Sequence, residues 1–211
     1  MATSRITSLM PIGVSLFLIS LFSSVALANV EVGQQAPNFT LNDSQEESIS
    51  LSSFNQDIVV LEWTNHECPY VGKHYGSHNM QTLQKQYGAK QVIWLSIISS
   101  APGKQGYVEP AEARRLTVSR DASPYAVLFD PEGKVGKMYG ATNTPHMFVI
   151  DKGRIAYMGG IDSIRSADPD DIPQARNHVA AALDELLAGK PVSVPVSRPY
   201  GCGVKYKGGW W

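Results

Sequence analysis

One cysteine stands where its thiol could be reactive. Cys68 lies in the stretch LEWTNHECPYVGKHYG, between an apolar run and a segment with helical character. Pro69 suits the first position of a helix, because its missing N–H would have no partner there. The unpaired N–H groups and partial positive charge of a helix N-terminus stabilise a thiolate, which is the reactive form of cysteine. We therefore predict a lowered pKa and redox chemistry for Cys68; a buried structural cysteine is the alternative.

Other polar residues near this cysteine in the sequence could tune its reactivity. His66, Lys73 and His74 could place positive charge near the thiol, and Glu67 could accept its proton. A solvated loop position is an equally good interpretation of His66. His74 and His78 have the i, i+4 spacing of a metal-binding pair, but that spacing is more typical of a solvated helix face. Because a pattern of about four Cys and His ligands is missing, the sequence predicts no metal site.

The N-terminus bears on the compartment in which the protein works. Arg5, an apolar run over residues 9–22 and the A-x-A pattern at residues 26–28 predict a signal peptide over residues 1–28, cleaved before Asn29. An uncleaved anchor is the alternative, although the run is short for a bilayer span. We expect an exported protein, periplasmic or secreted, with no membrane contact after cleavage. Such a compartment would allow Cys68 and Cys202, which form an even pair, to become a disulfide.

Hydrophobic patterning predicts one α/β domain over residues 29–189, followed by a Pro/Gly-rich tail over residues 190–211 that carries Cys202. The expected elements are strands at residues 36–43, 49–54, 57–63, 91–98 and 125–130, a hairpin at 146–159, and helices at 69–87, 110–119 and 173–188. This order indicates a sheet covered by helices on both faces. The net charge is -1 and no basic stripe is present, which argues against nucleic-acid binding.

Three motifs and their order resemble the thioredoxin superfamily. They are VVLEWTNHECPYV, TNTPHMFVID about 75 residues later, and KGRIAYMGGID. The earlier GQQAPNFTLND resembles the opening of its peroxiredoxin-like branch, the redoxins of the alkyl hydroperoxide reductase and thiol-specific antioxidant type. The resemblance covers residues 32–188 and implies a thioredoxin-like fold, with a central mixed sheet flanked by helices and an N-terminal β extension. It also implies that Cys68 is the active cysteine and faces Thr144 and a cis-Pro145 across the site.

The resemblance further implies that the residues around the cysteine line the site: Thr64, Asn65, His66, Glu67 and Pro69. Two departures from the family pattern matter. In the C-x-x-C motif the second cysteine is replaced by Val71. In the peroxidatic motif P-x-x-x-[T/S]-x-x-C, the proline and hydroxyl positions hold Leu61 and Asn65, with Thr64 one residue away from the hydroxyl position.

We therefore expect a thiol-disulfide oxidoreductase or thiol peroxidase in which Cys68 attacks a peroxide or a protein disulfide. An external thiol would serve as reductant, and no cofactor is implied because sulfur carries the electrons. The alternative is a non-enzymatic module that binds an extended peptide beside Pro145 by main-chain pairing. A weaker alternative is metal handling by Cys68 with nearby histidines.

Cys202 is the candidate resolving or structural partner of Cys68. About a dozen residues separate it from the predicted end of the last helix, and such a segment can span roughly 40 Å. Pro191, Pro195 and Pro199 favour an extended path, and glycines on both sides of Cys202 would allow close backbone approach. In the rival interpretation Cys202 stays free or pairs between chains.

Overall fold

The computed structural model describes residue 1 and residues 30–209. The predicted signal peptide therefore lies outside the described residues, apart from Met1. The strands are β1 (Thr40–Asn42), β2 (Ser48–Ser50), β3 (Ile58–Trp63), β4 (Ile93–Ile98), β5 (Ala126–Phe129), β6 (Asn143–Thr144), β7 (His146–Asp151), β8 (Arg154–Gly159) and β9 (Cys202–Gly203). The α-helices are α1 (Pro69–Gly76), α2 (Asn79–Gly88), α3 (Pro110–Ser119), α4 (Lys134–Tyr139) and α5 (His178–Leu187), with 3-10 helices η1 (Leu51–Phe54) and η2 (Pro169–Gln174). None of the helices in the described part of the chain is both long and apolar enough to span a bilayer.

The central sheet has five strands in the order β5-β4-β3-β7-β8. β3 is parallel to β4 and antiparallel to β7, and five of its six residues are buried. This explains its largely apolar sequence, because a strand with helices on one face and further structure on the other has no solvated side. The predicted mixed sheet is confirmed.

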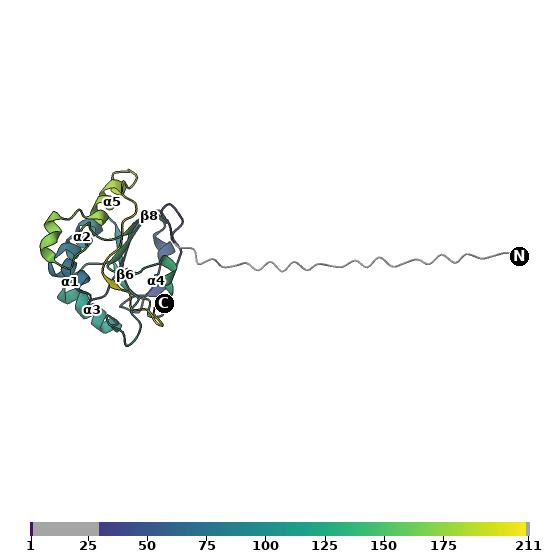
Figure 1. Ribbon diagram of the computed structural model, residues 1–211, viewed down its shortest axis with the longest axis horizontal. Coiled ribbons are helices and arrows are strands. Elements are labelled where there is room, and N and C mark those ends of the chain that lie inside the picture. Colours follow the sequence, from purple (N-terminus) through teal and green to yellow (C-terminus); the bar gives the residue numbers. More distant parts are fainter. Residues whose placement is uncertain (2–29, 210–211) are drawn as a thin grey trace.

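Helices α1, α2, α3 and α5 lie on one side of the sheet and α4 lies on the other, as Figure 1 shows. The two faces bury separate apolar clusters. Val60 of β3 packs with α1, α2 and α5 and with Cys68, whereas Leu61 packs with α4 and the N-terminal segment. The alternation of side chains along β3 therefore decides which residues face α1, the helix that follows Cys68.

Four predicted elements differ from the structure. The strand expected at residues 36–43 is shorter, with only Thr40–Asn42 in β1. The single helix expected over residues 69–87 is broken where His78 adopts a left-handed conformation (φ 60°). The strand expected at residues 49–54 turns into η1 after Ser50. The last helix begins at His178 rather than Pro173, because the Asn177 side chain accepts a hydrogen bond from the Ala180 N–H and caps it there. Pro173 instead lies inside η2.

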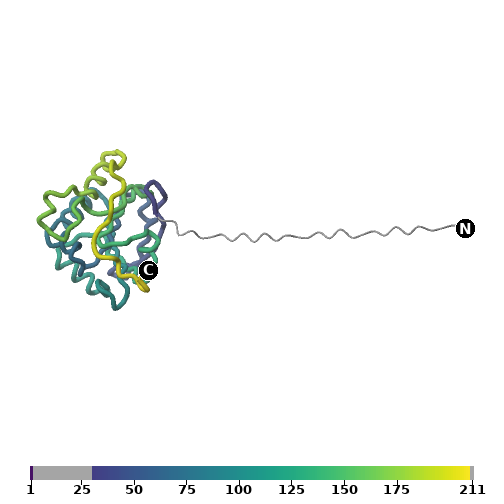
Figure 2. The backbone as a smooth tube through the Cα atoms, in the orientation of Figure 1, coloured from purple at the N-terminus to yellow at the C-terminus, as the bar shows by residue number. Residues whose placement is uncertain are grey.

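The tail returns from the end of α5 across the body of the molecule, which Figure 2 shows as the yellow end of the tube. It first pairs with β8, where the Met158 N–H donates to Pro195 O and the Ser197 N–H donates to Met158 O. It then forms β9, which pairs with β6 antiparallel and sets Cys202 opposite Thr144. The extended tail expected from its prolines thus has a defined course that passes beside the Thr144–Pro145 bond.

Candidate functional site

Cys68 is the residue directly before α1, and its backbone is extended there (φ -78°, ψ 123°). Pro69 occupies the first turn of the helix. The Cys68 side chain is 1% exposed, and its Sγ donates to Thr144 O at 3.1 Å. The bond between Thr144 and Pro145 is cis, as the resemblance implied. The end of β3, the start of α1 and the turn before β7 therefore meet at the sulfur.

The pKa of the Cys68 thiol lies below its ordinary value, although burial acts to raise it. Hydrogen bonding from the Cys202 thiol opposes burial most strongly, followed by the Val71 backbone N–H and Thr144. Val71 is the third residue of α1, so its N–H is one of those that the helix leaves without an intrahelical acceptor. The helix terminus and the second cysteine together favour the thiolate.

We expect alkylation of Cys68 by iodoacetamide to show a midpoint below that of free cysteine, about 8.5. Peptide mapping would follow Cys68 separately from Cys202. The Cys202→Ala variant removes the largest favourable contribution, so its midpoint should be higher. A midpoint near that of free cysteine in both proteins would contradict the assignment of a stabilised thiolate.

Cys202 lies against Cys68 on the tail and packs into the same apolar cluster. Its side chain is partly exposed and both cysteines are free thiols. Burial and the neighbouring Cys68 raise the pKa of the Cys202 thiol to about 11. Gly201 makes the approach of the tail possible, because a Cβ on this residue (φ +127°) would overlap Thr144 O. Gly203, also expected to permit close approach, has only ordinary contacts.

A buried polar cluster, which the sequence did not reveal, anchors the tail to α1. Lys73 Nζ lies 3.3 Å from Asp162 Oδ2, and Tyr200 OH donates to Asp162 Oδ1 at 2.6 Å. His74 Nε2 lies 3.1 Å from the same Tyr200 OH. Tyr200 precedes Cys202 by two residues, so the cluster fixes the tail close to the second cysteine.

This cluster also corrects the expectation that Lys73 and His74 bring positive charge to the site. The Lys73 ammonium is paired with the Asp162 carboxylate, and both side chains are buried. Burial lowers the pKa of His74 to about 4, so its ring is neutral at neutral pH. The solvated helix face expected for His74 and His78 is wrong for His74, which is fully buried.

The predicted lining residues that precede Cys68 turn toward two neighbouring elements. Thr64 and His66 line a small cavity of about 40 Å³ with Arg120 at the end of α3. Glu67 Oε2 accepts from the Gly106 N–H at 2.6 Å, and the Asn65 Nδ2 donates to Gln105 O at 3.4 Å. Asn65 also accepts from the Glu67 N–H through Oδ1. These contacts hold the loop before Cys68 against residues 105–106 and α3.

Glu62 is a second buried polar group that the sequence analysis missed. It lies within β3, fully buried, and its carboxyl group accepts from Trp94 Nε1 at 2.8 Å, Tyr75 OH at 2.9 Å and Ser96 Oγ at 3.0 Å. Burial raises the pKa of Glu62 despite these hydrogen bonds. The sequence does contain a sign of this buried group, because Glu62 is the single charged residue within the apolar run VVLEW.

His146, which follows Pro145, is a buried neutral group near the site. Its ring stacks on Phe148 with centroids 4.7 Å apart, and its Nδ1 accepts from the Thr142 N–H at 3.3 Å. Burial lowers the pKa of His146 to about 4. Among residues 30–209, no group of three His, Cys, Asp or Glu side chains is arranged to hold a metal ion.

Acidification from pH 6.5 to 4 should destabilise the protein partly through His146. In this window the unfolded chain binds a proton at His146 and the folded chain does not, so the free energy of unfolding falls by as much as roughly 3 kcal/mol. Urea unfolding of the His146→Gln variant at several pH values should show a shallower pH dependence. Glu62 contributes with the opposite sign, but equally in both proteins. Identical slopes would contradict a neutral buried His146.

The edge that a peptide-binding module would use at Thr144 is occupied by the tail of the chain itself. The β6–β9 pairing places Gly203 opposite Asn143 and Cys202 opposite Thr144. The Asn143 Nδ2 also donates to Gly201 O at 2.9 Å. An incoming peptide would have to displace these contacts before pairing with β6.

Comparisons with known proteins agree with this geometry. The family model described as AhpC/TSA family matches residues 32–158. A crystal structure of an uncharacterized conserved protein from Geobacillus kaustophilus is similar, with 24% identity and a TM-score of 0.72, covering 85% of this chain and 94% of that one. A hypothetical protein from Sinorhizobium meliloti 1021 has 22% identity and a TM-score of 0.72, covering 86% and 98%. The peroxidoxin BcpB from Mycobacterium tuberculosis has 20% identity and a TM-score of 0.52, covering 76% and 98%.

At these identities the solved structures establish the thioredoxin-like fold alone, whereas the family model spans more than half of the chain. A search of curated proteins found no match. The matched residues include Cys68, Thr144 and Pro145. The chain therefore belongs to the AhpC/TSA family of thiol-dependent oxidoreductases.

Proposed function

We propose that this protein is an exported thiol peroxidase in which Cys68 is the nucleophile and Cys202 the resolving thiol. The observation that carries the proposal is the β6–β9 pairing, which sets Cys202 opposite Thr144, while Thr144 O accepts the hydrogen bond from Cys68 Sγ. The two thiols also differ in acidity in the direction that such a pair needs. The pKa of Cys68 is lowered and that of Cys202 is raised.

The Cys68 thiolate attacks one oxygen of a peroxide and becomes a sulfenic acid, while the other oxygen leaves as an alcohol or water. The Cys202 thiol then attacks the Cys68 sulfur; a disulfide forms and water carries away the hydroxyl group and the Cys202 proton. Two external thiols reduce the disulfide and restore both cysteines. This route uses a resolving cysteine from the tail in place of the missing one at position 71.

A peroxide fits this site better than a protein disulfide, the other substrate expected for Cys68. Cys68 is 1% exposed, and the tail occupies β6 beside it. A small peroxide needs little room, whereas a protein disulfide needs the tail to move away. The signal-peptide pattern over residues 1–28 supports export. In an oxidising compartment outside the cytoplasm, a Cys68–Cys202 disulfide could persist between turnovers.

Stoichiometric hydrogen peroxide should convert the reduced protein to a form with a Cys68–Cys202 disulfide. Non-reducing peptide mapping should recover the two cysteine peptides joined within one chain, and dithiothreitol should separate them. In the Cys202→Ser variant the same treatment should leave a sulfenic acid on Cys68, detectable by dimedone. If Cys68 peptides never join Cys202 peptides after peroxide, the tail cysteine is not the resolving thiol.

A further inference from the structure

A polar cleft of about 880 Å³ is lined by residues of α1, β6, the segment after β8 and the tail, and has no part in the steps above. Gly201, directly before Cys202, lines it together with Tyr70 of α1 and Asn143 of β6. Tyr70 packs edge to face on Tyr200, with ring centroids 5.9 Å apart. A volume of this size matches sites that hold small molecules. A small molecule in the cleft would therefore lie against Gly201, the residue next to the tail cysteine.

The charges that line the cleft are positive. Arg165 and Arg198 both contribute to its wall, and none of its lining residues is acidic. Neither arginine forms an ion pair or a side-chain hydrogen bond within residues 30–209. The carboxylate of Asp162, which is close to Arg165 in the sequence, pairs with Lys73 and His74 instead. Guanidinium groups bind carboxylates through paired N–H donors. The cleft thus offers two exposed guanidinium groups that have no acidic partner within residues 30–209.

The occupant is small rather than a polypeptide strand. The nearest edge for strand addition is β6, and β9 already pairs with it. The tail at this point is also fixed by Tyr200, whose hydroxyl donates to the buried Asp162. A protein partner that adds a strand would have to break both contacts. A small molecule can enter the cleft with the tail in place.

Of the two cysteines, Cys202 is the more accessible, and it directly follows Gly201 in the wall of the cleft. Cys202 is partly exposed, whereas Cys68 is 1% exposed beneath the tail. In thiol–disulfide exchange the thiol of lower pKa leaves faster. The pKa of Cys68 is lowered and that of Cys202 is raised. Access and leaving-group ability therefore agree that Cys202 is attacked and Cys68 leaves.

Resting on the proposed function, we propose that this cleft binds a low-molecular-weight thiol bearing carboxylates, which reduces the oxidised protein by attacking Cys202. The thiolate of the ligand bonds to Cys202 Sγ, the Cys68–Cys202 bond breaks, and its electron pair leaves on Cys68 as a thiolate. A second thiol attacks the ligand sulfur of this mixed disulfide. The ligand is released as its own disulfide, and the electron pair leaves on Cys202, which is then protonated to the thiol. Two thiols are oxidised and one protein disulfide is reduced.

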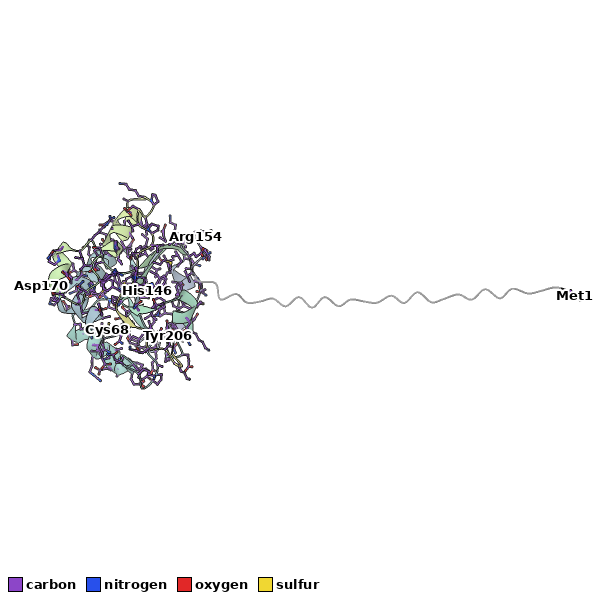
Figure 3. The ribbon with its side chains drawn as sticks, in the orientation of Figure 1. Met1, Cys68, His146, Arg154, Asp170 and Tyr206 are labelled. Atoms are coloured by element: carbon purple, nitrogen blue, oxygen red, sulfur yellow. The ribbon has the colours of Figure 1, made fainter. Side chains whose placement is uncertain are left out.

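The first test compares reductants of different charge on the oxidised protein. Glutathione is the probe, and its diethyl ester, with neutral ester groups, is the matched control. The double variant Arg165→Gln/Arg198→Gln should lower the rate constant for glutathione by roughly tenfold and leave the ester and dithiothreitol nearly unaffected. Arg154→Gln, which Figure 3 shows well away from Cys68, removes the same charge elsewhere and should change nothing. Added salt should reduce the advantage of glutathione.

A second measurement identifies the sulfur that is attacked. Limiting glutathione is added to the oxidised protein with iodoacetamide present, and the mixture is mapped after acid quenching. Glutathione should be found on the Cys202 peptide and the alkyl group on the Cys68 peptide. Glutathione on Cys68, or equal rates for glutathione and its ester that the double variant leaves unchanged, would overturn this proposal while the disulfide stands. If peroxide forms no Cys68–Cys202 disulfide, the proposed function fails first and this inference fails with it.

Discussion

Replacing Cys68 with serine should lower peroxide consumption in the presence of dithiothreitol by roughly three orders of magnitude or more, the scale on which loss of a nucleophile acts. A serine hydroxyl remains protonated at neutral pH and does not attack peroxide oxygen in this way. The fold should survive, because serine is a favoured residue at the position before a helix, where Cys68 lies. Loss of activity in this variant therefore reports on chemistry rather than on unfolding.

Cys202→Ser provides the matched control for that experiment. Dithiothreitol can reduce the Cys68 sulfenic acid directly, so this variant should keep most of its turnover, with the intramolecular disulfide absent. Circular dichroism and unfolding midpoints of both variants would confirm the fold. Peroxide consumption by Cys68→Ser at the wild-type rate would exclude Cys68 as the nucleophile.

Truncating Asp162 to alanine should destabilise the protein by about 3–5 kcal/mol, as expected when one partner of a buried ion pair is removed. The change leaves the Lys73 ammonium buried without a counter-charge and takes away the acceptor of the Tyr200 hydroxyl. Urea unfolding measures the loss. Because Tyr200 precedes Cys202 by two residues, alkylation of Cys202 should also become faster in the folded variant.

Two further variants show whether burial is the cause of that loss. Asp121 pairs with Lys85 on the surface, where both side chains are largely exposed (71% and 49%), so Asp121→Asn should leave the unfolding midpoint nearly unchanged. Combining Asp162→Leu with Lys73→Met removes both charges and should recover much of the stability lost in Asp162→Ala. An Asp162→Ala variant as stable as Asp121→Asn would show that the cluster does not anchor the tail.

The fold could be predicted because its signals are local. β3 and β4 are apolar runs, α3 begins at Pro110 as its sequence indicates, and Lys152–Gly153 has the two-residue form of a hairpin. The start of α5 was placed incorrectly, because Pro173 and Asn177 are both good helix-start residues. The Asn177 side chain caps the helix in the structure.

The part of the site that depends on distant contacts could not be predicted in the same way. Lys73 and Asp162 are 89 residues apart, and His74 and Tyr200 are 126 residues apart. No periodicity or spacing links such positions, and only packing of the tail on α1 brings them together. Glu62 is different, because a charged residue in a strand buried on both faces is a visible conflict that requires buried hydrogen-bond partners.

The course of the tail also determines whether the edge strand β8 has unpaired backbone N–H and C=O groups. As the last strand of the sheet, β8 would offer a row of unpaired backbone groups to another chain. The N-terminal segment covers its first part, where Gly33 N–H donates to Ile155 O and Ile155 N–H donates to Gln34 O, and the tail covers Met158. Pro191, Pro195 and Pro199 of the tail have no N–H of their own that a further strand could pair with. The same segment that delivers Cys202 therefore protects the sheet from strand-to-strand association, and shortening it should favour aggregation even where no cysteine is lost.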